Sequence, residues 1–181
     1  MRLFLAAAVF LFAPALPGQP SSARDYELKA AFLVKFTQYT TWPSSTFTAS
    51  NTPVVIGVLD ADPLFDELQK QAKDFVSARP IEIRHVNSLD EAASCHVLFL
   101  GEAMSRKEAD WFTALRGKPI LTVGESDRTI EHGAIMRFVI KNRSVRFEAN
   151  LAASAANQLE LSERMLTVAA KVYKTTRATS P

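Results

Sequence analysis

The sequence predicts an α/β fold of three layers, in which a mostly parallel sheet carries helices on both faces. Residues 53–59 form an almost unbroken apolar run, which is typical of a strand buried on both faces in the middle of such a sheet. Asp62 and Pro63 follow directly, and these residue types favour the cap and the first turn of a helix. Strand and helix patterns then alternate as far as residue 123, as successive β-α-β units require.

The chain has 181 residues, enough for one domain with its own core, and we expect this domain to span residues 24–174. Its 21 basic and 19 acidic residues give a net charge of +2. A charge this close to balance gives no indication of a nucleic-acid-binding surface or of a polybasic membrane patch.

Residues 1–23 predict a signal peptide for export. Arg2 supplies a positive start, residues 3–13 are apolar, and small residues up to Ala23 suit a cleavage site near that position. The apolar run is shorter than the roughly 20 residues that a membrane-spanning helix needs, and an uncleaved anchor is the alternative. The polar residues 175–181 predict a disordered tail.

Residues 24–40 predict the first helix, which ends before Trp42 because the residue preceding a proline disfavours helical geometry. Its largest apolar side chains recur at helical spacing and are Leu28, Phe32, Phe36 and Tyr39. This apolar arc is wide enough to serve either the core or a dimer interface, and both alternatives stay open. Trp42 is expected to pack in the core or at a hinge, with stacking on a ligand as the alternative.

Three further strands are expected, at residues 81–86, 97–100 and 119–123. The helix that follows the first strand covers residues 63–74, with Asp62 as its cap. The spacing S-x-x-E, which forms a capping box, begins at Ser88 and again at Ser105. Each occurrence predicts the start of a helix, and the second of these helices ends before Gly117.

The pattern changes after residue 133. Residues 134–140 and 144–148 have the character of strands, and their three-residue link is too short for a crossover, so we expect an antiparallel hairpin. Two closing helices are expected after the hairpin, over residues 151–157 and 162–173.

Motifs of common catalytic and cofactor sites are absent, including G-x-S-x-G, H-E-x-x-H, the Walker loop and G-x-G-x-x-G. Cys95 is the single cysteine, so it cannot form an internal disulfide, and we expect it to be buried. His85 and His96 fall in strand patterns and are expected to be packed, whereas His132 precedes a glycine and is expected to be solvated. We therefore expect no catalytic residue, no metal site and no cofactor, with a zinc site assembled in three dimensions as the alternative.

Acidic residues follow three of the predicted parallel strands. They are Asp60, Glu102 and Glu125, and because parallel strands end at one edge of a sheet, they should line a common rim. Small molecules bind at this edge in open parallel sheets, so the rim is a possible ligand site. Helix caps and a solvated edge are the simpler explanation of the same residues.

Several stretches together resemble the YfiR family of periplasmic proteins. The two most distinctive are YELKAAFLVKFTQYTTWP at residues 26–43 and VRFEANL at residues 145–151. The other matching stretches are residues 55–62, 88–101, 119–126, 133–144 and 161–169. In order, these stretches span nearly the whole chain after residue 23.

The resemblance implies a non-enzymatic periplasmic regulator that forms a homodimer. It implies repression of a membrane-bound diguanylate cyclase through contact with the periplasmic sensor region of that enzyme, and hence control of cyclic-di-GMP signalling and biofilm formation. A second implied partner is an outer-membrane lipoprotein of the YfiB type. Two features depart from the family: Cys95 has no partner for the disulfides of better-known relatives, and Met136-Arg137 replaces the usual small-polar pair.

We place the expected partner-binding surface on the hairpin and the segment after it. The residues are Met136, Glu148, Asn150 and Leu151. The argument is that an edge strand offers unpaired backbone groups to a partner, and helix capping by Glu148 and Asn150 is the alternative. A periplasmic small-solute sensor that uses the acidic rim is a competing hypothesis for the function, and a hydrolase with an unrecognised site is a third.

Overall fold

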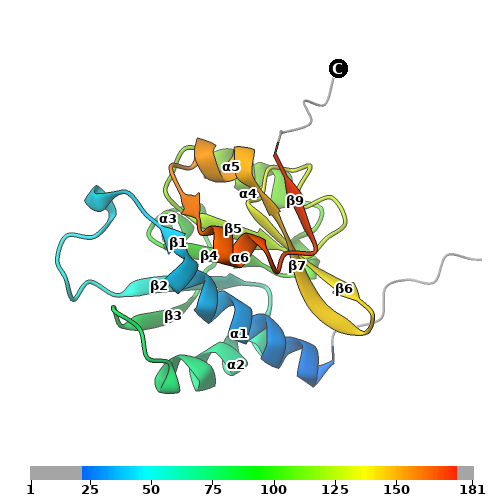
Figure 1. Ribbon diagram of the computed structural model, residues 1–181, viewed down its shortest axis with the longest axis horizontal. Coiled ribbons are helices and arrows are strands. Elements are labelled where there is room, and N and C mark those ends of the chain that lie inside the picture. The colour runs from blue at the N-terminus through cyan, green and yellow to red at the C-terminus, as the bar shows by residue number, and fades with distance from the viewer. Residues whose placement is uncertain (1–21, 175–181) are drawn as a thin grey trace, which may run out of the picture.

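The computed structural model describes residues 22–174, so the expected signal peptide and tail lie outside the described residues. The strands of the central sheet are β2 (Val54–Leu59), β3 (Ile81–His85), β4 (Val97–Leu100), β5 (Leu121–Gly124), β6 (Met136–Lys141), β7 (Ser144–Asn150) and β9 (Lys171–Tyr173). Their order across the sheet is β3-β2-β4-β5-β6-β7-β9 (Figure 1). The first five run parallel, β7 pairs antiparallel with β6, and β9 runs parallel to β7. The expected parallel sheet and hairpin are both confirmed.

Helices cover this sheet from two sides. They are α1 (Ala23–Tyr39), α2 (Asp62–Asp74), α3 (Leu89–Ala93), α4 (Glu108–Ala114), α5 (Leu151–Ala156) and α6 (Glu163–Leu166). One apolar cluster joins α1, α2 and α6 to one face of the sheet, and a second joins α3 and α4 to the other face. The three-layer α/β architecture predicted from the sequence is therefore confirmed.

A second, smaller sheet lies at the end of α1. It consists of β1 (Thr40–Thr41) and β8 (Glu160–Leu161), which pair antiparallel. At its other end, α1 begins with a capping box, in which the Ser22 hydroxyl accepts from the Asp25 amide and the Asp25 carboxylate accepts from the Ser22 amide. The start of α1 is thus fixed by local hydrogen bonds, and its end by hydrogen bonds to a segment far along the chain.

Aromatic side chains join α1 to the β6–β7 hairpin. Phe36 is 1% exposed, and its ring centroid lies 5.0 Å from that of Phe147 and 6.0 Å from that of Phe138. Phe32 lies 5.5 Å from Phe147 on the same side. Edge-to-face and offset contacts at these distances add to the stabilisation from burial alone.

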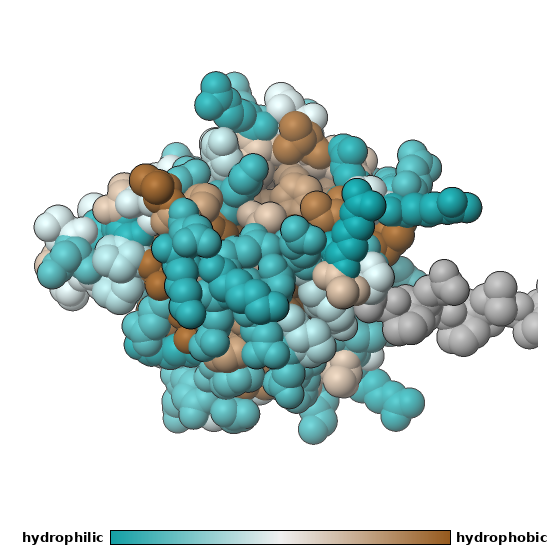
Figure 2. Space-filling model, turned by 90° about the horizontal axis from the view of Figure 1, so that it is seen from below, coloured by the Kyte–Doolittle hydropathy of each residue, from teal (hydrophilic) through white to brown (hydrophobic). Residues whose placement is uncertain are grey.

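The wide apolar arc of α1 is used mostly within the chain. Phe36 belongs to the core, and Leu28, Phe32 and Tyr39 are partly buried against it. Seen from below, where α1 and α2 lie, the surface is largely hydrophilic with small separate apolar patches (Figure 2). The structure therefore favours the core alternative for Phe36, while a dimer interface at the other three positions stays a prediction.

The second closing helix was predicted wrongly. The structure has only the short helix α6 after residue 162, and the chain then extends into β9, where Val172 pairs with Ala149 of β7. The outer edge of β7 offers backbone groups that the chain can pair with, and the Ala170 amide donates to the Phe147 carbonyl at 2.7 Å. Pairing with a sheet edge thus prevails over the helical spacing of the apolar residues.

Two predicted helix caps are also wrong. Ala61 precedes α2 without a side-chain cap, and Asp62 is instead the first helical residue, where a negative charge still favours the helix dipole. The helix expected from Ser105 begins at Glu108, after an uncapped Lys107. The cap at Ser88 is confirmed, because its hydroxyl accepts from the Glu91 amide at 3.2 Å.

The packing of α1 on the hairpin leads to a test of stability. Replacement Phe36→Ala should lower the free energy of unfolding by about 3–5 kcal/mol, because it leaves a cavity between α1 and the sheet. Urea denaturation followed by circular dichroism measures this loss. The control Val76→Ala changes a side chain that is 89% exposed and should have almost no effect. Equal effects of the two replacements would contradict the proposed core.

Candidate functional site

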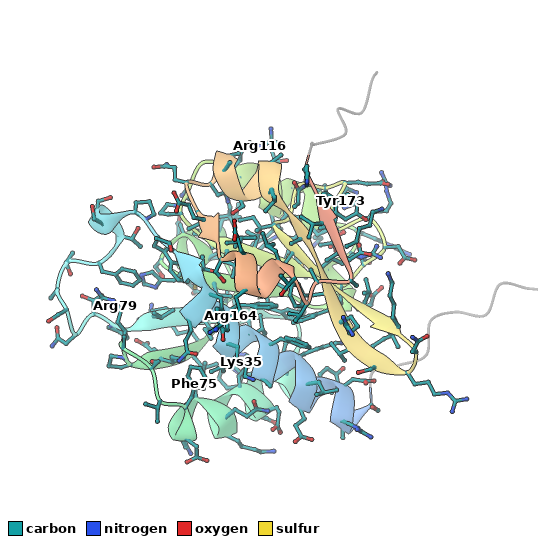
Figure 3. All side chains as sticks on the ribbon, in the orientation of Figure 1. Lys35, Phe75, Arg79, Arg116, Arg164 and Tyr173 are labelled. Atoms are coloured by element: carbon teal, nitrogen blue, oxygen red, sulfur yellow. The ribbon has the colours of Figure 1, made fainter. Side chains whose placement is uncertain are left out.

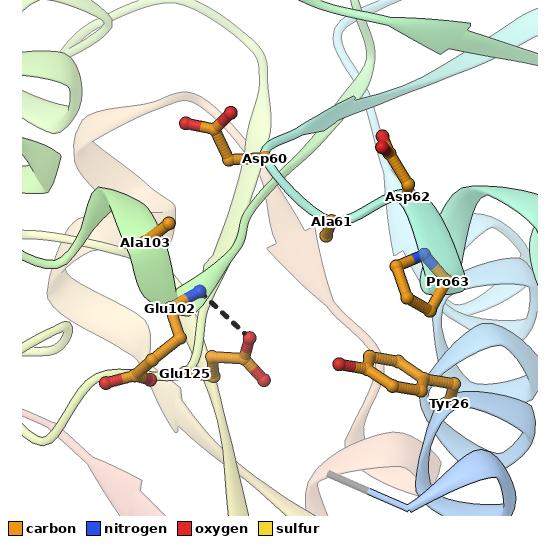
Figure 4. Close-up of a pocket in the computed structure, with 8 residues that line it drawn as sticks. All are labelled: Tyr26, Asp60, Ala61, Asp62, Pro63, Glu102, Ala103 and Glu125. Atoms are coloured by element: carbon orange, nitrogen blue, oxygen red, sulfur yellow. Dashed lines mark hydrogen bonds between the residues drawn. The ribbon is translucent and has the colours of Figure 1, made fainter. Parts of the chain in front are cut away.

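The three carboxylates expected at strand ends lie together around one pocket of about 360 Å³. Asp60 follows β2, Glu102 follows β4 and Glu125 follows β5, so the common edge of the parallel strands brings them together (Figure 4). The remaining lining residues are Tyr26, Ala61, Asp62, Pro63 and Ala103. The structure shows the rim that the sequence predicts, whereas ligand binding there stays a prediction.

Close backbone packing brings the ends of β2 and β4 together beside this acidic pocket. A Cβ atom on Gly101 would lie 2.2 Å from the Asp60 carbonyl oxygen, so the ends of β2 and β4 can approach this closely only with glycine at position 101. Asp60 itself takes a left-handed φ of 51° as the chain leaves β2. This turn sends the chain from β2 into α2 along the side of the pocket.

A buried lysine fixes Glu125. Lys29 of α1 is 2% exposed and forms an ion pair with the Glu125 carboxylate, which also accepts from the Glu102 amide at 3.1 Å (Figure 4). Glu102 is more accessible, but partial desolvation and the neighbouring Glu125 carboxylate raise the pKa of its side chain. The pocket therefore combines one neutralised carboxylate with others that would attract a cation.

A buried polar cluster around Glu108 lies near this pocket and is missed by sequence reasoning. Glu108 is 2% exposed, and its carboxylate accepts hydrogen bonds from the hydroxyls of Ser126 and Thr129. The Nδ1 atom of His132 lies 2.8 Å from the same carboxylate. Glu108 thus ties α4 to residues 126–132, the segment that follows Glu125.

An ionic network lies across β6, β7 and β9, beside the segment that follows Glu125. The Glu148 carboxylate accepts from the Tyr173 hydroxyl at 3.0 Å and lies 3.5 Å from Nε of Arg137. The 3.5 Å contact lacks hydrogen-bond geometry, so the Arg137 Nε atom is buried without an acceptor among the described residues. Arg137 and Glu148 are cross-strand partners, which explains why their side chains share a face.

The structure corrects the argument for the expected partner surface. Neither hairpin strand is an edge, because β6 lies between β5 and β7, and β7 lies between β6 and β9. Met136, Glu148 and Asn150 are 0%, 5% and 1% exposed, so their side chains face this chain rather than a partner. The Asn150 side chain caps α5 by accepting from the Ala153 amide at 3.1 Å. Leu151 is partly exposed and is the accessible member of the set.

The histidines and the cysteine occupy three kinds of environment. His96 is packed as expected, and its Nδ1 atom accepts from the Val55 amide at 3.0 Å. His132 is not solvated, since its side chain is 16% exposed beside Glu108. His85 ends edge strand β3 and is 51% exposed, and its ring stacks on Phe65 with centroids 3.5 Å apart. Cys95 is buried, and burial raises the pKa of its thiol to about 11. A thiol of this kind is unreactive at neutral pH.

Comparison with protein families gives a match over residues 26–170 to the family described as YfiR/HmsC-like. The chain belongs to the YfiR/HmsC-like family. YfiR/HmsC-like proteins are periplasmic and generally regulatory rather than catalytic, and the family is associated with cyclic-di-GMP signalling. No curated protein sequence matches the chain.

Solved structures similar to this YfiR/HmsC-like chain include an ABC domain in complex with L-Trp from Streptococcus pneumonia. The TM-score is 0.53 at 10% sequence identity, and the match covers 82% of this chain and 60% of the other. At so low an identity the likeness concerns the fold alone. The YfiR/HmsC-like chain thus spans less than two thirds of that structure.

Two further properties concern residues 22–174 of the YfiR/HmsC-like chain. In this part of the chain no helix has both the length and the apolar character needed to cross a membrane. Within the same residues, no group of three or more histidine, cysteine, aspartate or glutamate side chains is placed to hold a metal ion.

The buried carboxylate of Glu108 provides a second test of stability. Replacement Glu108→Ala should lower the free energy of unfolding by about 2–4 kcal/mol, because it leaves two buried hydroxyls and a partly buried imidazole without their shared acceptor. The matched control Asp110→Ala removes an exposed carboxylate from the same helix and should change stability by less than about 0.5 kcal/mol. Chemical denaturation of both variants measures the difference, and similar values for the two would disprove the role of Glu108.

Proposed function

We propose that this protein is a periplasmic regulator that binds and represses a membrane-bound diguanylate cyclase. The observation that supports the proposal is the family match, which extends over residues 26–170 and therefore includes every layer of the fold. The repressor would contact the periplasmic sensor region of the cyclase and act by occupying that surface. An outer-membrane lipoprotein of the YfiB type would compete for it and release the cyclase.

The accessible part of the expected partner surface begins at α5. Leu151 is the first residue of this helix and is partly exposed, directly after the buried cap Asn150. The ion pair of Arg137 with Glu148 and the pairing of β7 with β9 connect the preceding strand to both of its neighbours. A partly exposed leucine on a fixed support is a suitable anchor for a protein partner, since such anchors lose little conformational entropy on binding.

A homodimer is the second part of the proposal. The partly buried residues Leu28 and Phe32 give α1 an apolar strip that a second copy could cover. The area needed for a specific interface, about 1,200–2,000 Å² in total, would require contacts beyond this strip.

Loss of the repressor should raise cyclic-di-GMP. In cells that carry the partner cyclase, deletion of the gene for this protein should increase the cellular cyclic-di-GMP content and biofilm formation. Restoring the wild-type gene should reverse both effects. Unchanged cyclic-di-GMP after deletion, in cells shown to contain active cyclase, would refute the proposed repression.

Two leucines in equivalent local positions allow a matched test of the surface. Leu151 begins α5 after the Asn150 cap, and Leu89 begins α3 after the Ser88 cap. Replacement by aspartate is compatible with both helix starts, because a negative charge there favours the helix dipole. Complementation should fail for Leu151→Asp and succeed for Leu89→Asp, with both proteins present at wild-type level. Full repression by a folded Leu151→Asp protein would exclude this surface.

The acidic pocket supports a second candidate function, the sensing of a small solute. Its unneutralised carboxylates Asp60, Asp62 and Glu102 favour a cation such as an amine. Because the pKa of Glu102 is raised, this carboxylate gains its proton earlier than an ordinary glutamate as the pH falls, and binding of a cation should weaken on acidification.

Calorimetric titration with a panel of amines and amino acids tests this candidate. A compound of the panel that binds should have lower affinity for the Glu102→Gln variant, and it should bind the wild type more weakly at pH 5 than at pH 7.5. The Asp90→Asn variant changes an exposed position outside the pocket and should bind the compound as the wild type does. Absence of heat with every compound of the panel would dismiss solute sensing at this pocket.

A further inference from the structure

Strand β3 forms one edge of the central sheet (Figure 1). Among residues 22–174 it pairs with β2 alone, and only along one side. Its sequence is IEIRH, so no proline within the strand blocks further pairing. An edge strand of this kind offers a row of backbone donors and acceptors to a strand from another chain.

The ladder with β2 determines which backbone groups of β3 face the free edge. The Val54 amide of β2 donates to the Pro80 carbonyl at 2.8 Å, just before β3 begins. In a parallel ladder, alternate residues turn their N–H and C=O groups towards the same neighbour. Glu82 and Arg84 therefore face β2 with their backbone groups. The residues whose backbone groups face the free edge are Ile81, Ile83 and His85.

The side chains of β3 alternate between the two faces of the sheet. Glu82 and Arg84 share one face, where Nε of Arg84 lies 2.6 Å from the Glu82 carboxylate and both side chains are nearly half exposed. On the other face, the two isoleucines of β3 pack against the core, and His85 stacks on Phe65 of α2. The free edge thus has a charged side and an apolar side.

The start of β3 is anchored to the rest of the chain. The strand follows the turn that carries Phe75 and Arg79 (Figure 3). Phe75 packs against the core, and Nη1 of Arg79 donates to the carbonyls of Ala49 and Ser50 at 2.7 and 3.0 Å. Because the edge is already extended and anchored, its pairing with another strand would require little ordering of the backbone.

The order of charges on β3 is self-complementary. Two antiparallel copies related by a two-fold axis at Ile83 place Glu82 of each strand opposite Arg84 of the other. These are the closely spaced pairs without hydrogen bonds, because the backbone groups of both residues face β2. The outward backbone groups would form about six hydrogen bonds between the copies. A register centred on Glu82 or on Arg84 puts like charges opposite each other, so the charges select one register.

We propose that the edge of β3 binds β3 of a second copy of this chain, antiparallel and centred on Ile83. The two seven-stranded sheets then form one continuous sheet. On the apolar side, Ile81 of each copy lies opposite His85 of the other, beside the Phe65 ring. The inference rests on the homodimer proposed above and assigns it a surface other than the apolar strip of α1. It does not depend on the repression of a cyclase.

Paired charge variants of the purified protein test this register. Glu82→Arg leaves only positive charges on the charged side of β3, and Arg84→Glu leaves only negative ones. Each variant alone should raise the dimer dissociation constant about tenfold in sedimentation equilibrium, because both symmetric pairs become pairs of like charge. An equimolar mixture of the two variants should associate about as strongly as the wild type, since every pair then joins opposite charges.

A matched control changes an ion pair of the same residue types elsewhere on the surface. Arg128 and Glu131 lie 3.5 Å apart with exposed side chains outside β3. Glu131→Arg should leave the dissociation constant unchanged, and circular dichroism establishes that all variants are folded.

Hydrogen exchange provides an independent readout of the same pairing. The Ile83 amide faces the free edge, so it should become protected as the protein concentration rises through the dissociation constant. Equal exchange of this amide in monomer and dimer would contradict the pairing of the two strands.

Three further results would overturn the assignment. A dimer that Glu82→Arg leaves intact and Leu28→Asp disrupts would place the interface on the α1 strip. A mixture of the two charge variants that associates no better than each alone would exclude the register. A protein that is monomeric at every concentration would refute the β3 interface and the homodimer together. The repression of a cyclase is tested separately, by cyclic-di-GMP content.

Discussion

The fold depends on the burial of α1 against the β6–β7 hairpin. Phe36 fills the contact between Phe138 and Phe147, and this packing closes one face of the sheet. The helix also connects the two ends of the molecule. Tyr26 lines the acidic pocket near the start of α1, and Thr37 lines a groove of about 690 Å³ near its end. From Tyr26 to Thr37 an α-helix rises by roughly 16 Å, so one element contributes to two separate surfaces.

Strand and helix patterns predicted the fold class well, because buried parallel strands and a short hairpin link have few alternative interpretations. The acidic rim could also be placed from sequence, since Asp60, Glu102 and Glu125 each follow a parallel strand and must share an edge. The closing strand β9 could not be placed. Its helical apolar spacing was outweighed by pairing with the free edge of β7, a long-range effect that local pattern does not contain.

Side-chain roles were harder to predict than strands. Glu108 stands at capping-box distance from Ser105, which hid its role as a buried acceptor for residues more than 17 positions away. Glu148 and Asn150 were placed on a partner surface, but the neighbouring strand β9 and the helix α5 engage them within the chain. These contacts join residues that are far apart in the sequence, such as Glu108 and Ser126. Only information on which distant residues are buried together could have revealed them.

A regulator of this kind acts by binding, so its effect should appear with purified components. The most direct measurement is the rate at which membranes containing the partner cyclase convert GTP to cyclic-di-GMP, as the purified protein is added from the periplasmic side. The account predicts a saturable fall of this rate with increasing protein. A rate that stays constant at every protein concentration, with correctly oriented and active cyclase, would contradict it.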